Sequence, residues 1–226
     1  MVILKYALKR ILRNPVTLVA NFILPIVLII LPVLWNGDGR GYFLLAMVIM
    51  FGAFPLTGGM LADRRERVVV RIMSTPTTAF RYLSQNLIAC MTPLFVQVTL
   101  ISSLGIILHG WTLSFAFFIG VLYFFFAASS VAFSFAWNCL FKNKEVSFSI
   151  LSMVLTLASF AGLLIPLSIL PDYLRNIAMI FPAYWIANGL EYLISYGVNI
   201  QYGISLLVLL IFTFMFILFG SKRGIH

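Results

Sequence analysis

Side chains of the kinds that usually carry out enzyme chemistry are few in this sequence and lie far apart. The two histidines, His109 and His226, fall at a predicted turn and at the last residue, so no Cys/His cluster has metal-ligand spacing. The sequence also lacks a glycine-rich GxxxxGK[ST] loop, the usual cradle for ATP phosphates. Cys90 and Cys139 lie near the ends of apolar stretches, where cysteine acts as a small packing residue. We therefore predict that the chain is not an enzyme and has no cofactor or metal of its own.

The densest charge lies in one segment, Asp63–Ser84. Arg67 follows Asp63 by four residues and precedes Arg71 by four, so the three side chains share one face of a helix. Pro76 should end that helix, because proline cannot continue the hydrogen-bond ladder. Apolar residues interleave with the arginines, which favours a docking surface, and an ordinary solvated basic loop is the alternative. The charged residues of the segment are Asp63, Arg64, Arg65, Glu66, Arg67, Arg71 and Arg81.

The N-terminal segment, Met1–Asn14, has the pattern of an amphipathic helix. Lys5, Lys9 and Arg13 recur every four residues on one face. Such a helix lies in the membrane interface, with its cations near anionic lipid. A simple orientation tether is the alternative, and both interpretations place the segment on the cytoplasmic surface. The apolar face consists of Leu4, Leu8, Ile11 and Leu12.

The segment Pro171–Asn199 is apolar but too interrupted to cross a membrane as one helix. Its halves, Asp172–Ile180 and Ala183–Ser195, can each form a short helix, and neither reaches across about 30 Å of hydrocarbon. A re-entrant helical hairpin on the outer side fits this pattern better than a further span. The residues that define the predicted hairpin are Pro171, Pro182, Trp185 and Glu191.

The composition places the chain in a membrane. Hydrophobic residues make up 62% of the sequence and charged residues only 9%, with a mean hydropathy of +1.09. A soluble domain carries roughly 25% charged residues. The net charge of +9 does not indicate nucleic-acid binding, because the basic residues lie between apolar stretches, where they orient helices in a bilayer. We predict an all-α membrane protein that forms one transmembrane domain over residues 1–226.

Six apolar stretches are predicted to be transmembrane helices. When they alternate in direction, thirteen of the fifteen Lys and Arg residues fall on one side. Basic residues are enriched in cytoplasmic segments, so both termini are predicted to be cytoplasmic. The predicted spans are Val16–Trp35, Tyr42–Ala62, Gln85–Leu108, Leu113–Leu140, Ser147–Leu170 and Tyr202–Phe219.

These spans contain no Asp, Glu, Lys or Arg. Transporters that are coupled to protons or ions usually need such groups inside the membrane. The energy for any transport is therefore predicted to come from another protein. The candidate residues lining a pathway are Met47, Met50, Phe51 and Phe54, a soft apolar wall in the second span, with the mildly polar Thr156 and Ser159 in the fifth.

Four short motifs, in this order, are similar to those of a known family. They are Lys5–Arg13 followed by Asn14-Pro15; Glu66-Arg67 with Arg71-Ile72-Met73-Ser74-Thr75-Pro76; Leu170-Pro171-Asp172-Tyr173-Leu174; and Pro182-Ala183-Tyr184-Trp185. Over nearly its whole length the chain resembles the permease subunit of type-2 ATP-binding-cassette exporters. One departure stands in the second motif, where Val68-Val69-Val70 replace the Gly-Thr that often follows the glutamate.

The resemblance implies a partner and a mechanism. The first cytoplasmic loop would be a coupling helix in a groove of a cytosolic ATPase subunit, which would hold the ATP and Mg. Two permease chains, identical or different, would line the pathway, chiefly with their second and fifth spans. The cargo would be a drug, antimicrobial peptide or lipid-like molecule leaving a bacterial inner membrane. The residues implied to contact the ATPase are Asp63, Arg64, Glu66, Arg67, Arg71, Thr75 and Pro76, with Lys9 and Arg13 of the amphipathic helix beside them.

Two other functions remain open at this point. One is a self-contained secondary transporter or channel, which the absence of intramembrane charge disfavours. The other is a membrane immunity protein that binds an antimicrobial peptide through the outer hairpin.

Overall fold

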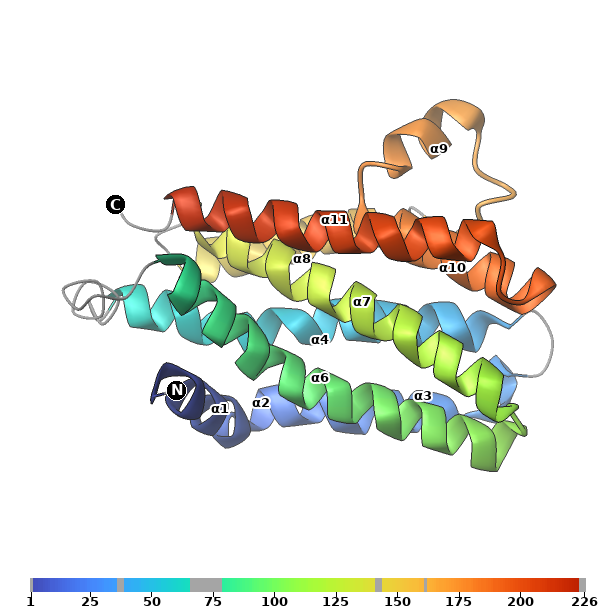
Figure 1. Cartoon of the computed structure of the whole chain (residues 1–226), viewed down its shortest axis with the longest axis horizontal. Coiled ribbons are helices and arrows are strands. Elements are labelled where there is room, and N and C mark those ends of the chain that lie inside the picture. Colours follow the sequence, from blue (N-terminus) through green and yellow to red (C-terminus); the bar gives the residue numbers. More distant parts are fainter. Residues whose placement is uncertain (1, 36–38, 66–78, 141–143, 161, 224–226) are drawn as a thin grey trace.

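The computed structural model describes residues 2–35, 39–65, 79–140, 144–160 and 162–223. Within these ranges all regular secondary structure is helical, so the predicted all-α class is confirmed for the described part of the chain. The long helices run side by side along one axis, and the short helix α9 (Asp172–Ala178) stands apart from them (Figure 1).

The N-terminal region forms a chain of short helices. Helix α1 (Val2–Arg13) is followed by α2 (Pro15–Leu18), the π-helix η1 (Val19–Ile23) and α3 (Leu24–Ile30). The π-turn precedes Pro25, and the amide of Leu24 bonds the carbonyl of Val19. Proline supplies no N–H, so the helical ladder rearranges next to it.

The predicted first span, Val16–Trp35, is wrong at its outer end. The helix stops at Ile30, because Leu31 is extended before Pro32 and a 3-10 turn, η2 (Pro32–Leu34), follows. The helical run from Pro15 to Ile30 is about 24 Å long, which is shorter than a hydrocarbon core of about 30 Å.

Four helices of the described residues are long and apolar enough to cross a membrane. They contain the predicted second, third and sixth spans, and the fourth except for its last two residues. All four belong to stretches whose hydropathy alone indicated a span. These helices are α4 (Arg40–Arg65), α6 (Ala79–His109), α7 (Leu113–Asn138) and α11 (Ile200–Arg223).

The predicted fifth span, Ser147–Leu170, is wrong as a continuous helix. Helix α8 (Lys144–Ser159) ends at Ser159, and the chain then turns. Gly162 has a φ of +112°, a conformation that favours glycine, and a Cβ there would lie 2.7 Å from the Cβ of Ala187. The tight packing of this turn requires glycine.

Two short helices, α9 and α10 (Pro182–Tyr196), lie where the sequence predicted a helical hairpin, and the re-entrant placement of this pair stays a prediction. Their axes differ by 110°. Counting this bent pair as one crossing gives up to five candidate spans in the described residues, so the six-span arrangement stays a prediction.

Helix α7 lies at the centre of the bundle. It packs against α4, α6, α8, α10 and α11. Leu122, Tyr123 and Phe126 of α7 are completely buried. A helix that is apolar on every side is stable in such a position because it has no face that must reach water.

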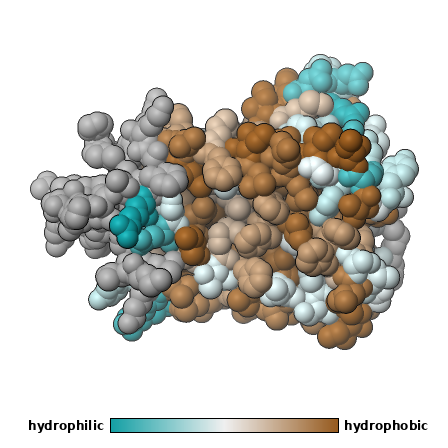
Figure 2. Space-filling view, in the orientation of Figure 1, coloured by the Kyte–Doolittle hydropathy of each residue, from teal (hydrophilic) through white to brown (hydrophobic). Residues whose placement is uncertain are grey.

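The first helix and the end of the last helix lie at the same end of the bundle. Helix α1 and the last turn of α11 are at the left of the bundle in Figure 1. We call this the terminal end, and the other the opposite end. In Figure 2 apolar side chains cover the middle of the visible face, whereas hydrophilic side chains gather toward the terminal end and around the upper right, where α9 lies. This is the surface expected of a protein whose middle faces lipid.

Candidate functional site

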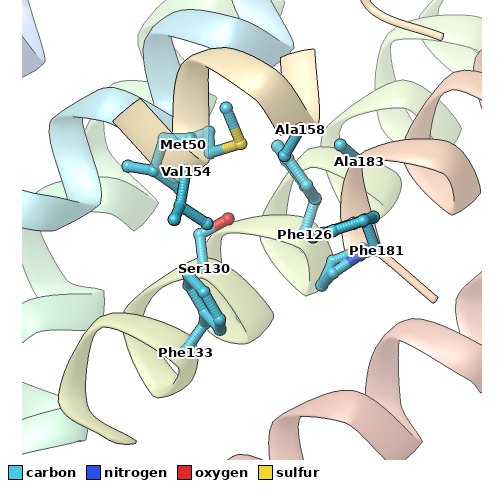
Figure 3. Close-up of a pocket in the computed structure, with 10 residues that line it drawn as sticks. Met50, Phe126, Ser130, Phe133, Val154, Ala158, Phe181 and Ala183 are labelled. Carbon is cyan, nitrogen blue, oxygen red and sulfur yellow. The ribbon is translucent and has the colours of Figure 1, made fainter. Parts of the chain in front are cut away.

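A small apolar cavity lies where α4, α7, α8 and α10 meet. Its volume is about 20 Å³, which has room for about one water molecule. Figure 3 shows Met50, Phe126, Phe133 and Phe181 closing around it, with the hydroxyl of Ser130 turned inward. The cavity is therefore too small to hold a molecule much larger than water.

The predicted pathway residues of α4 differ in burial and in their distance from the cavity. Met50 lines the cavity, and Phe54 is buried with its ring centroid 4.8 Å from that of Phe148 on α8. Met47 and Phe51 are partly buried against the core. Helices α4 and α8 contact each other.

The two predicted pathway residues of α8 do not line the cavity. Thr156 is exposed and donates a hydrogen bond to the carbonyl of Ser152, and Ser159 is buried and donates to the carbonyl of Leu155. Both hydroxyls therefore bond within their own helix. The α7 rings Phe126 and Phe133 take part instead, and no sequence signal separated them from the other phenylalanines of that helix.

A buried polar cluster joins three helices near the terminal end. Nδ2 of Asn138 (α7) donates to Oγ1 of Thr57 (α4) at 3.1 Å, and Oγ of Ser147 (α8) donates to Oδ1 of Asn138 at 3.2 Å. The Thr57 hydroxyl donates in turn to the carbonyl of Phe54 at 2.8 Å. Thr57, Asn138 and Ser147 are each at most 1% exposed. We call these three residues the polar cluster.

The opposite end carries a cluster of rings instead. Trp35 stacks on His109 with centroids 4.5 Å apart, and Trp111 and Tyr42 pack beside them. Nε1 of Trp35 donates to the carbonyl of Leu28 at 3.1 Å, and Nε2 of His109 lies 2.8 Å from the carbonyl of Ile29. These carbonyls belong to the last turn of α3, where a helix leaves its carbonyls without partners. We call Trp35, Tyr42, His109 and Trp111 the aromatic cluster.

The bent pair α9–α10 is held by two side-chain bonds. Trp185 donates from Nε1 to the carbonyl of Met179 at 2.8 Å, and Nε of Arg175 donates to the Tyr184 hydroxyl at 3.4 Å. The bond to Tyr184 raises the pKa of the Arg175 guanidinium, and the charge of Glu191 adds to the effect. The charge of Glu191 on α10 therefore interacts with Arg175 on α9, and the sequence alone did not indicate this pairing.

Helix α1 packs on α6, with Ala7 and Ile11 buried. Lys9 and Arg13 are exposed. They line an open surface depression together with Tyr6, Arg10 and Asn14. We call this depression the basic depression.

The match to a family model decides the class of protein. Residues 39–222 match the model described as ABC-2 family transporter protein. The chain belongs to the ABC-2 transporter family. A search of curated proteins found no match.

The matched region of this ABC-2 permease runs from the start of α4 almost to the end of α11. The resemblance drawn from the motifs is therefore confirmed. Members of this family are membrane transport subunits, generally without catalysis of their own, and they associate in general with an ABC ATPase. The chain is thus a multi-pass membrane protein and an ABC transporter permease.

Most of the predicted ATPase contact lies outside the described residues. Asp63 and Arg64 belong to the last turn of α4, which continues to Arg65. Glu66, Arg67, Arg71, Thr75 and Pro76 are among the residues that the structure does not describe. The assignment of this segment to the ATPase therefore stays a prediction.

Proposed function

We propose that this ABC-2 permease is the membrane subunit of an exporter that a separate ABC ATPase drives. The family match over residues 39–222 carries the proposal. We further propose six spans in a bacterial inner membrane, with the terminal end in the cytoplasm. The predominance of Lys and Arg in the segments at this end supports the orientation.

The contact with the ATPase is assigned to the segment that follows α4. Asp63 and Arg64 lie in the last turn of that helix, so a force on the segment acts directly on a helix of the cavity wall. Helices transmit such displacements because they are stiff, and packed interfaces shift between discrete arrangements.

The polar cluster lies on the route of this displacement. Thr57 is eight residues before Arg65, about two turns of helix, and Asn138 joins it to Ser147 near the start of α8. Movement of α4 would therefore be passed to α8, its partner at the cavity. This linkage supports a pathway that opens between the two helices.

The cargo is assigned to the hydrophobic or amphipathic class, such as a drug, an antimicrobial peptide or a lipid-like molecule. The cavity wall is apolar, with only the Ser130 hydroxyl among the side chains that Figure 3 labels. A second permease chain, identical or different, would complete the pathway. The bent pair α9–α10 would close it on the outer side.

The proposal is tested by purifying the tagged chain from its native membrane in mild detergent and identifying the proteins that accompany it by mass spectrometry. We expect a stoichiometric soluble subunit with an ATP-binding cassette. A chain that comes out alone and transports cargo under a proton gradient would overturn the proposal in favour of a secondary transporter.

A charge reversal tests the docking segment itself. Glu66→Lys or Arg67→Glu should lower cargo-dependent ATP hydrolysis and transport by tenfold or more, since the two partners would repel each other. The matched control is Arg81→Glu, at an exposed position of α6 in the same predicted loop. Transport equal to that of the unmodified permease in all three variants would count against docking by this segment.

A further inference from the structure

The basic depression on α1 has the properties of a site for a lipid headgroup. Five residues line it: Tyr6, Lys9, Arg10, Arg13 and Asn14. Three of them are cations, and the other two offer a hydroxyl and an amide. Arginine and lysine are the side chains that most often hold phosphate oxygens, arginine by two parallel bonds and lysine as a point charge.

The other residues of α1 indicate that a phosphate bound here would belong to a membrane lipid. Successive helix residues are about 100° apart, so Ala7 and Ile11, which are buried against α6, form one strip. The basic depression flanks this strip on one side, and Leu8 and Leu12 flank it on the other. Leu12 is 51% exposed. An apolar flank that is open to the surroundings opposite a cationic flank is the pattern of a helix lying in a membrane interface.

The depth of α1 along the bundle agrees with this position. Val19 and Ile23, which follow on the same run of helices, are exposed apolar residues of the kind that face lipid tails. Val19 is only six residues beyond Arg13, and Asn14 separates α1 from α2 between them. The polar headgroup layer extends roughly 5–8 Å beyond the hydrocarbon core on each side. The cations of α1 therefore lie close to the edge of the lipid-facing surface, where the lipid phosphates are expected.

We propose that the basic depression binds the phosphodiester of an anionic glycerophospholipid. Anionic phospholipids attract basic residues at the membrane surface, which supplies the charge complementarity. The proposal assigns Lys9 and Arg13 to lipid and leaves the ATPase contact to the segment after α4. It does not depend on the identity of the cargo or on the ATPase, and only the choice of the cytoplasmic leaflet rests on the proposed function.

The test measures lipid retained on the purified full chain by native mass spectrometry, with phosphatidylglycerol or phosphatidylcholine added to the detergent. We expect phosphatidylglycerol to bind and phosphatidylcholine not to bind. Lys9→Gln and Arg13→Gln together should weaken phosphatidylglycerol binding by roughly tenfold or more, since each basic residue near the surface contributes several-fold. Lys9→Arg, which keeps the charge, should retain binding.

The matched control is Arg81→Gln, which removes one exposed cation from another helix at the same end. It should change binding by less than twofold. An equal loss in this control would show diffuse attraction and overturn the site. Displacement of the lipid by millimolar inorganic phosphate would show that the depression takes free phosphate, which overturns the lipid assignment.

The same variants separate lipid binding from ATPase docking. If Lys9→Gln and Arg13→Gln leave lipid retention intact but abolish copurification of an ATPase, α1 is part of the docking surface and the lipid proposal is wrong. If an ATPase copurifies with both variants while lipid is lost, the lipid proposal is supported. Thermal unfolding in phosphatidylcholine alone confirms that the variants are folded before either result is used.

Discussion

The aromatic cluster at the opposite end and the polar cluster near the terminal end join neighbouring helices by different means. At the opposite end, Trp35, Tyr42, His109 and Trp111 fill space with rings, and two of them also bond the carbonyls of α3. Near the terminal end, small side chains make single hydrogen bonds between helices. Ring packing is lost as soon as the helices separate, whereas a hydroxyl or amide can exchange one partner for another. The comparison indicates that the aromatic cluster holds the helices in place, whereas the polar cluster links α4, α7 and α8 by bonds that can re-form as the helices move.

At the opposite end, two glycines of the helix backbone allow tryptophan rings of the aromatic cluster to pack closely. A Cβ on Gly105 would lie 2.3 Å from Trp111, and a Cβ on Gly41 would lie 2.7 Å from Trp35. Both rings therefore lie directly against helix backbone. Such close packing leaves no room for adjustment. The polar cluster shows no comparable approach of a ring to a glycine among its described contacts.

The largest effect is expected from Trp111→Ala. The ring of Trp111 is 7% exposed and contacts Trp35, Tyr42 and Phe115. Its removal should lower the free energy of unfolding by about 3–5 kcal/mol, as for other buried aromatic residues. Thermal unfolding in detergent measures the change. The control Phe117→Ala removes a ring that is 64% exposed near the same end, and an equal destabilisation there would remove the distinction between the clusters.

A smaller effect is expected from Asn138→Leu in the polar cluster. The substitution leaves the Thr57 and Ser147 hydroxyls without their interhelical partner and should cost about 1–3 kcal/mol of stability. Transport should fall further than the loss of folded protein explains, because α4 and α8 would no longer move together. Unfolding and transport are measured on the same preparation. A variant that loses stability and keeps its transport rate per folded molecule would assign the cluster to packing alone.

Gln97→Leu should stabilise the protein, in contrast to the two substitutions above. Gln97 is 1% exposed in α6, and neither its Oε1 nor its Nε2 has a hydrogen-bond partner within the described part of the chain. Removing an unsatisfied buried amide should raise the free energy of unfolding by about 1 kcal/mol. The melting temperature measures this gain. A lower melting temperature would show that Gln97 has a bonded partner in the membrane, such as a water.

The smallest effect is the coupling between Thr57 and Asn138. A double-mutant cycle of Thr57→Val and Asn138→Leu should give an interaction energy of about 0.6 kcal/mol, the average for hydrogen bonds between membrane helices. The matched control is Thr213→Val, since Thr213 is also buried but bonds only within its own helix, to the carbonyl of Leu209. A cycle of Thr213→Val with Asn138→Leu should give no coupling.

Several features of the fold could be predicted from local sequence. Long apolar stretches indicated α4, α6, α7 and α11, and prolines and glycines indicated the two short helices before α11. The fifth span was wrong because the apolar stretch continues through the turn after α8, where residues such as Leu164 and Ile169 are exposed. The structure shows that α8 ends at Ser159 and that Gly162, in the turn that follows, packs against Ala187, twenty-five positions along the chain.

The candidate site was predicted only in part. Met50 lines the cavity as the sequence indicated, but Thr156 and Ser159 bond to their own helix. Hydroxyls in apolar helices make such bonds frequently, and their spacing does not show which of them face a neighbour. The sequence analysis did not single out Asn138, because the role of this residue depends on its hydrogen bonds to two residues on different helices.

The sequence by itself determined the membrane class, the family and the approximate positions of the long helices. These properties follow from composition, hydropathy and short motifs, which are local. Tertiary structure alone decided that α7 is central and that the two clusters form. Asn138 and Thr57 are 81 positions apart, and so are Tyr42 and Tyr123. Contacts at such separations between helices that are apolar all round leave no periodic pattern in the sequence, so only the packed bundle reveals them.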